Sequence, residues 1–437
     1  MEKLKLSKID QIVVGIIALV SLYLIVFQIP NVGLWQDEAA SLFYSSSIYW
    51  RDLFADTNPP LYNFLLKLSF LILPPTEISA RYFGSLVAFT IPIIGYLTAS
   101  RFYGKKQAFW VAILFSLNAI HIRYALEIRS YILLEFFSVL NLYFYLSSNE
   151  KKKLSCGYIL SAVALVLTNY VGLALPLAHL LVYAYEKWNK KQEFKWSYLS
   201  SAFIFLGAYL FFSHNQWPQH LSIQNVLSHF SLEQSLKKNF VNYFSFAFLC
   251  ITFAFWKKNR DDLVYKTVFL SLLILIFGSL SLGHIVSVEK YFIFLIPYIL
   301  IGIASQVVNQ QKILRYALLS SYLLINGGRI AYHFNRAHSA WPEIMKKASI
   351  YSSVVILARE HSSVEKYFST FEMPVISFWD IKDLSFPDKK HIIVIEPDSI
   401  KANKNTYERK DYQLIDEGWL GLDSYAPAYY YHYAQEN

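Results

Sequence analysis

A series of apolar stretches recurs along three quarters of this chain and limits the folds that it can adopt. The first runs from Gln11 to Ile29, and roughly 20 helical residues are enough to cross the hydrocarbon of a bilayer. Others follow at residues 81–100, 107–120, 130–147, 157–167, 171–183, 198–213, 241–256, 267–282, 291–306 and 316–330. We therefore predict eleven membrane-spanning helices.

The composition excludes the main soluble classes. The chain of 437 residues is 55% hydrophobic and only 16% charged, whereas soluble proteins have about 45–50% apolar and about 25% charged residues. The high hydrophobic content excludes intrinsic disorder, and 2 cysteines exclude a disulfide scaffold. The net charge of +9 is better explained by basic cytoplasmic loops than by a nucleic-acid partner.

Loop charges indicate the orientation. Lysines precede the first stretch and acids follow it, so the N-terminus is predicted to be cytoplasmic and the loop 30–60 external. With eleven crossings, the later basic clusters fall on the cytoplasmic side without exception. The segment 157–185 has Lys-rich flanks at both ends, so we expect it to cross twice, with an external turn at residues 168–170.

Two segments do not fit the spanning pattern. Leu61–Leu73 is apolar but short, lies between two Pro-Pro pairs, and is interpreted as an interfacial or partly inserted helix packed on the span after it. After Ile330 the chain becomes polar, and Ser353–Ala358, Met373–Phe378 and His391–Glu396 have strand character. The predicted fold is thus an all-α polytopic membrane domain, residues 1–331, followed by a small extracytoplasmic α/β domain, residues 332–437.

This topology gathers unusual polar residues on the external side. Ionisable groups at span ends inside a membrane protein are costly and are therefore functional candidates. The polar residues that gather on the external side are Asp37, Glu38, Asp56, Asn58, Arg123, Glu127, Arg129, Asn169, His284, Glu289 and Lys290.

The acids have both plain and functional interpretations. Asp37 and Glu38 could cap the helix that follows them, or could supply a general base or the ligands of a hard cation. Asp56 and Asn58, before Pro59 and Pro60, could form an ordinary helix start, or a rigid loop that shares a site with Asp37.

The same two interpretations apply to the basic residues. Arg123 and Glu127 lie four residues apart, as do Glu127 and Tyr131, so each pair could share a helix face. The arginines could stabilise the loop, or receive a phosphate, which the guanidinium matches with paired donors. Lys290 could anchor a span end in the interface or bind a lipid phosphate.

Four segments, taken in order, resemble the GT-C membrane glycosyltransferases, in the branch of the protein O-mannosyltransferases and the lipid A aminoarabinose transferase. They are Asp37-Glu38-Ala39, the sequence DTNPPLY from Asp56 to Tyr62, Ala80–Tyr131 with YALEIRSY at its end, and Thr168-Asn169-Tyr170 before Gly172. The resemblance covers roughly residues 10–185 and is weaker near Lys290.

The resemblance implies an inverting transfer of a sugar from a polyprenyl-phosphate donor, such as an undecaprenyl-phosphate glycoside. The acceptor would be an extracytoplasmic lipid, glycan or protein, and the enzyme would be a multi-pass protein of a bacterial inner or plasma membrane. By position, Asp37 would be the base and Glu38 its support, and Arg129, Arg123 and Lys290 would hold the donor phosphate. The residues that would line the site are Asp56, Asn58, Tyr62, Glu127, Tyr131, Asn169, His284 and Glu289.

The cofactor prediction stays open, because Asn58 stands where relatives often have histidine or lysine, and Asn169 stands where they often have histidine. Asparagine is a poorer transition-metal ligand than imidazole, so a divalent cation, if bound, would use Asp37 and Asp56. Two other functions compete with the enzyme: a transporter or flippase for lipid-linked glycans, and a catalytically silent GT-C-like scaffold. Many transporters contain internal repeats, and the sequence shows none.

Overall fold

The computed structural model describes most of the membrane domain and parts of the C-terminal region. The described residues are 8–29, 32, 34, 36–54, 56, 58–150, 154–189, 191, 204–207, 210, 263–282, 289–334, 341–351, 354–358, 375–377, 390–397, 412–420 and 428–435. The predicted spans 198–213 and 241–256 therefore lie almost wholly outside them.

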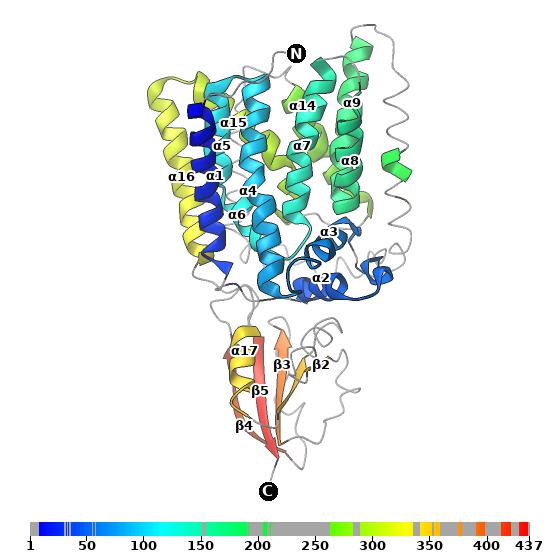
Figure 1. Cartoon of the computed structure of the whole chain (residues 1–437), viewed down its shortest axis with the longest axis vertical. Coiled ribbons are helices and arrows are strands. Elements are labelled where there is room, and N and C mark those ends of the chain that lie inside the picture. The colour runs from blue at the N-terminus through cyan, green and yellow to red at the C-terminus, as the bar shows by residue number, and fades with distance from the viewer. Residues whose placement is uncertain are drawn as a thin grey trace. The chain divides into compact units, whose positions relative to one another are not determined.

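The described part of residues 8–334 is helical, and its long helices run side by side (Figure 1). The helices begin and end close to the predicted boundaries, because apolar length sets where each must start and stop. They are α1 Lys8–Val26, α2 Gln36–Ser46, η2 Trp50–Phe54, α3 Leu61–Ser69, α4 Glu77–Phe102, α5 Lys105–Ser116, α6 Ala119–Leu126, α7 Tyr131–Glu150, α8 Cys156–Thr168, η3 Tyr170–Leu173, α9 Ala174–Asn189, α14 Leu263–Leu282, η5 Glu289–Leu295, α15 Ile296–Asn309 and α16 Lys312–Phe334.

Fewer membrane crossings can be assigned than the sequence predicts. Among the described residues, three helices are long and apolar enough to cross a membrane, at Glu77–Phe102, Tyr131–Glu150 and Lys290–Asn309. The bent pair α5 and α6 would be a fourth span. The number of eleven crossings, and the side of the membrane on which each loop lies, stay predictions.

One predicted span is broken. The stretch 107–120 is not one helix, because α5 ends at Ser116 and α6 begins at Ala119 with a bend of 50°. Asn118 lies at the break: its side chain accepts a hydrogen bond from the His121 amide at 3.0 Å and so caps α6. The same side chain donates to the Tyr322 hydroxyl at 3.1 Å, which ties the break to α16.

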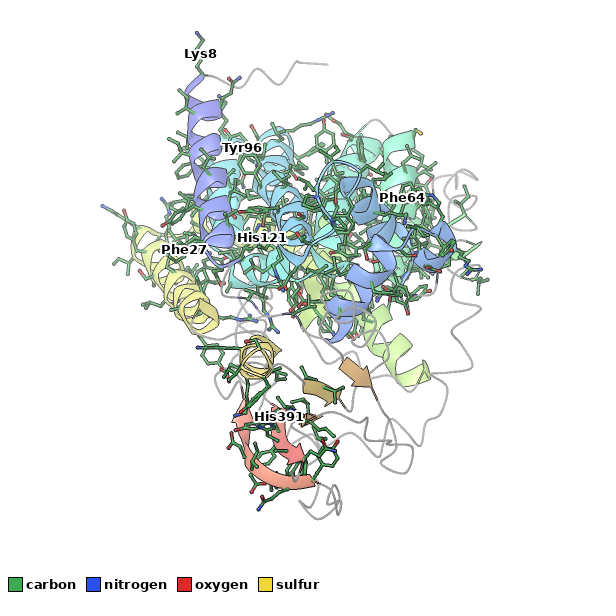
Figure 2. All side chains as sticks on the ribbon, turned by 60° about the horizontal axis from the view of Figure 1, so that its bottom comes forward. Lys8, Phe27, Phe64, Tyr96, His121 and His391 are labelled. Carbon is green, nitrogen blue, oxygen red and sulfur yellow. The ribbon has the colours of Figure 1, made fainter. Side chains whose placement is uncertain are left out.

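The helices enclose polar side chains as well as apolar ones. His121 lies inside the bundle (Figure 2), and its Nδ1 is 2.9 Å from Oε2 of Glu135 on α7. Neither side chain has any exposed surface. This pair links α6 to α7, the two helices on either side of the connection that carries Arg129.

Chain contacts divide the protein into two units, and each is described by itself. The first comprises residues 1–26, 57–65 and 82–330, and the second comprises residues 27–56, 66–81 and 331–437. The predicted boundary between residues 331 and 332 stays a prediction, because the second unit also takes in two segments from the N-terminal part of the chain.

In the C-terminal part of the second unit, the described residues form a five-stranded mixed sheet and the short helix α17, Trp341–Ala348. The strand order is β2-β1-β3-β5-β4, with parallel pairs around β1 and antiparallel pairs around β5 (Figure 1). The three predicted strands are confirmed as β1 Val354–Ala358, β2 Val375–Ser377 and β3 His391–Pro397. The prediction missed β4 Tyr412–Leu420 and β5 Ala428–Gln435.

Candidate functional site

Asp37 and Glu38 occupy the first turn of α2. Unpaired backbone amides at a helix N-terminus favour negative charge, so this is a stabilising position for two carboxylates. Successive helical residues point about 100° apart, and the two side chains accordingly have different surroundings. Glu38 is completely buried, whereas Asp37 is half-buried.

Glu38 is held by Arg81, which is not one of the site residues predicted from the sequence. Arg81 Nη1 lies 3.0 Å from Glu38 Oε1, and Arg81 Nη2 lies 3.4 Å from Glu38 Oε2. The same guanidinium contacts Glu77 Oε1 at 2.8 Å. Its fork geometry matches a carboxylate on two atoms at once, so Arg81 determines where the start of α2 lies relative to the start of α4. The sequence signal that could have indicated Arg81 is its position four residues after Glu77, which places the two side chains on one helix face.

Asp56, the third candidate acid, is also buried, at 6% exposure. Burial raises the pKa of Tyr44 on α2, and Asp56 and then Asp52 raise it further through their negative charge. The second unit therefore brings the Asp56 carboxylate into the electrostatic range of α2, the helix that carries Asp37.

Asn58 and Tyr62 belong to the first unit. Asn58 is half-buried, whereas Tyr62 on α3 is buried at 3% exposure and packs edge-on against Phe83 of α4, with ring centroids 6.3 Å apart. The short apolar segment is thus a helix packed on the one that follows, as predicted.

The connection between α6 and α7 forms a basic and aromatic cluster in the first unit. Arg123 Nε lies 3.6 Å from Glu127 Oε1, and its guanidinium lies over the Tyr124 ring at 5.1 Å. Glu127 and Arg129 are nearly buried, at 5% and 6% exposure. The Arg129 amide donates to the Glu127 carbonyl at 2.7 Å, which holds the connection in a tight turn.

Two residues far along the chain join this cluster. The Lys290 ammonium lies 5.4 Å from the centre of the Tyr131 ring, a cation–π contact that joins η5 to α7. Asn169 Nδ2 donates to the Ser130 hydroxyl at 3.3 Å. Within one unit, the structure therefore brings together Arg123, Glu127, Arg129, Tyr131, Asn169 and Lys290, which sequence analysis placed in three separate loops.

The charge of this cluster suits a phosphate. Arg123, Arg129 and Lys290 supply three positive charges, and Glu127 supplies one negative charge. Arginine and lysine in a site from which water is largely excluded bind phosphate oxygens more strongly than they do in water.

The remaining candidates stay predictions. His284 lies outside the described residues, and Glu289 is the first residue of η5. In the part of the chain that the structure describes, no three His, Cys, Asp or Glu side chains gather in a way that could hold a metal ion. Asp37 and Asp56 therefore stay predicted cation ligands.

Comparison with known proteins identifies the fold. A sequence model of the family described as dolichyl-phosphate-mannose-protein mannosyltransferase matches residues 57–217. An uncharacterized protein of Aquifex aeolicus (strain VF5) is 24% identical over 276 residues, which are 58% of this chain and 55% of that protein. The match thus spans about half the length of this relative.

Two solved structures match over nearly the whole chain. ArnT from Cupriavidus metallidurans bound to undecaprenyl phosphate has a TM-score of 0.57 at 11% identity, covering 97% of this chain and 98% of its own. The apo state of the same protein has a TM-score of 0.58 at 12% identity, with the same coverage. These matches confirm the resemblance found in the sequence, and the chain has the fold of the GT-C membrane glycosyltransferases.

Proposed function

We propose that this protein is a membrane glycosyltransferase that moves a sugar from a polyprenyl-phosphate donor to an extracytoplasmic acceptor. The observation that carries the proposal is the cluster around Arg129, where three cations from two distant segments surround one nearly buried turn. The ArnT structure that shares this fold is bound to undecaprenyl phosphate, a ligand whose phosphate has the chemistry that such a cluster recognises.

Donor recognition would depend on Arg123, Arg129 and Lys290. The donor is a phosphodiester with one negative charge, and the departing polyprenyl phosphate gains a second. Fixed cations that face this developing charge stabilise the transition state more than the ground state, which is the usual source of a large rate enhancement.

Acceptor activation would depend on Asp37. Its carboxylate takes the proton of the acceptor hydroxyl while that oxygen bonds to the anomeric carbon of the sugar. The bond between this carbon and the phosphate oxygen breaks on the opposite face, which inverts the configuration. Glu38, neutralised by Arg81, does not compete for the proton and instead holds the first turn of α2 in position.

The test follows polyprenyl phosphate release by the full-length protein in detergent. A panel of polyprenyl-phosphate sugars is supplied together with membranes of the native source as acceptor, with and without EDTA. We expect Asp37→Asn to lower release by about 10²–10⁴-fold, the usual contribution of a general base, without loss of donor binding. Asp52→Asn, which removes a carboxylate from the same part of the chain, is the matched control.

Two outcomes would contradict the proposal. Equal release by wild type and Asp37→Asn would remove Asp37 from the chemistry. If the wild type released no polyprenyl phosphate from any donor, even with native membranes, a transporter or silent scaffold would explain the fold better.

The EDTA arm tests the predicted cation separately. If EDTA lowers release by the wild type and no longer does so in Asp56→Asn, the cation is assigned to Asp56 in the second unit.

A further inference from the structure

A second basic site lies in the first unit, at the end where α5 and α16 begin and α15 ends. It is a cavity of about 370 Å³, lined by Lys105, Lys106, Phe109 and Trp110 of α5, Val308 of α15 and Arg315 of α16. Its volume falls in the range of roughly 300–1,000 Å³ that is typical of ligand pockets.

This cavity is distant from the cluster around Arg129. The segment Lys290–Asn309 begins at Lys290, which contacts Tyr131, and its penultimate residue, Val308, lines the cavity. Twenty helical residues extend on the order of 30 Å. The cavity and the Arg129 cluster therefore lie at opposite ends of the helical bundle and cannot share one phosphate.

The charges of the cavity are mostly uncompensated. Lys105 forms an ion pair of 2.7 Å with Asp10 of α1. In contrast, no carboxylate contacts Lys106 or Arg315 within the described parts of the chain. Three positive charges against one negative charge leave a net attraction for an anion.

Arg315 is held in place rather than free to move into solvent. Its Nη2 donates to the carbonyls of Val308 and Gln310, each at 3.1 Å. Its Nε is buried and has no hydrogen-bond partner among the described residues. Such an orphaned donor on a cation costs free energy unless an acceptor is supplied, and a phosphate oxygen is the acceptor that guanidinium groups match best.

The aromatic lining indicates where the ligand comes from. Trp110 and the partly exposed Phe109 lie one helical turn beyond Lys106. Tryptophan concentrates at the boundary between headgroups and acyl chains, and basic pockets between membrane helices bind anionic lipid headgroups. A soluble phosphate would have no use for the apolar side of the cavity.

We propose that this cavity binds the phosphate headgroup of an anionic membrane phospholipid. Lys106 and Arg315 contact the phosphate, and Phe109 and Trp110 pack against the start of the acyl chains. The cavity requires a lipid with a net negative charge, because a choline headgroup would bring a quaternary ammonium close to the same cations.

The test measures lipid binding directly. The full-length protein in detergent is titrated with phosphatidylglycerol or phosphatidylcholine, and bound lipid is counted by native mass spectrometry. We expect tighter binding of phosphatidylglycerol, and a loss of about fivefold in Lys106→Gln and in Arg315→Gln, since one basic residue near an anionic lipid contributes about 1 kcal/mol. Lys106 is exposed, so its variant should fold normally.

Matched controls separate the site from overall charge. Lys187→Gln removes the same charge from α9, outside the cavity, and should leave lipid binding unchanged. Equal binding of the two lipids by the wild type, or equal losses in Lys106→Gln and Lys187→Gln, would overturn the proposal. Displacement of phosphatidylglycerol by millimolar inorganic phosphate would assign the cavity to a soluble phosphate instead, and would overturn the lipid assignment.

Discussion

The guanidinium of Arg81 holds both carboxylate oxygens of Glu38, at 3.0 and 3.4 Å, where neither side chain has any exposed surface. The two residues are 43 positions apart, and their pairing joins the start of α2 to the start of α4. The two acids of the sequence pair thus differ in their surroundings: Glu38 is buried and held by Arg81, whereas the half-buried Asp37 is the proposed base.

This pairing predicts a strong non-additivity in stability. Removing one partner of a buried ion pair costs about 3–5 kcal/mol, because the other charge is left uncompensated. We expect Arg81→Met, which takes the guanidinium away from both Glu38 and Glu77, to lower the thermal unfolding midpoint in detergent strongly. Glu38→Leu, which leaves Arg81 its contact with Glu77 at 2.8 Å, should lower it less, and the double variant should lower it less than the sum. Additive losses would show that the two charges are not coupled.

Arg129 should act on the donor rather than on the acceptor. A hydrogen bond to a charged group contributes about 1.5–3 kcal/mol, so Arg129→Gln should lower kcat/KM for the donor by about 10- to 100-fold. Steady-state kinetics at varied donor concentration would measure this. Arg101→Gln, which breaks the ion pair with Glu150 at 2.9 Å, is the control and should leave donor kinetics unchanged.

Gly84 determines how closely α4 approaches α6. A Cβ at this position would lie 2.7 Å from the backbone carbonyl oxygen of Ala125, which cannot rotate away. Gly84→Ala should therefore displace α6, reduce stability by about 1–3 kcal/mol, and lower donor turnover through the displaced Arg123. Gly15→Ala on α1, where nothing lies within 4 Å, should change neither thermal unfolding nor turnover.

The C-terminal sheet should weaken in acid because of His432. Burial lowers the pKa of His432 to about 4, and the charge of His391 is the next largest cause of this shift. His391 Nδ1 lies 3.2 Å from His432 Nε2 on the neighbouring strand, and Figure 2 labels His391 on the sheet. Tyr351 packs edge-on against the His432 ring, and Lys347 and Asp416 are the charged groups that act on this ring among the described residues.

An unfolded histidine has a pKa of about 6.5, so the unfolded state takes up the proton first as the pH falls. The stability from neutral His432 is complete above about pH 6.5 and is lost progressively down to pH 4, at most about 3 kcal/mol. Hydrogen exchange of β3 and β5 amides in the full chain at pH 7 and pH 5, corrected for intrinsic rates, would measure the loss. His432→Gln should flatten this dependence, and α8, which has no carboxylate or imidazole, is the internal control.

Local sequence was sufficient for most of the long helices and for part of the sheet, but not for the break between α5 and α6. Apolar length defines α1, α4 and α7, since a membrane segment must satisfy its backbone hydrogen bonds internally. Lys-rich flanks on both sides of 157–185 required a break in the middle, and α8 does end at Thr168. The strands β4 and β5 were missed because charged residues and tyrosines replace the usual aliphatic pattern in them.

The residues themselves determined that this chain would form apolar helices, a polar C-terminal domain and a set of candidate side chains, because each of these depends on composition and spacing along a few turns of chain. The partners of these side chains could not be predicted in that way. Arg81 reaches Glu38, Lys290 reaches Tyr131, and Arg315 meets Lys106 around one cavity. Such pairings depend on how the helices pack against one another, and the residue pattern within a single segment does not predict that packing.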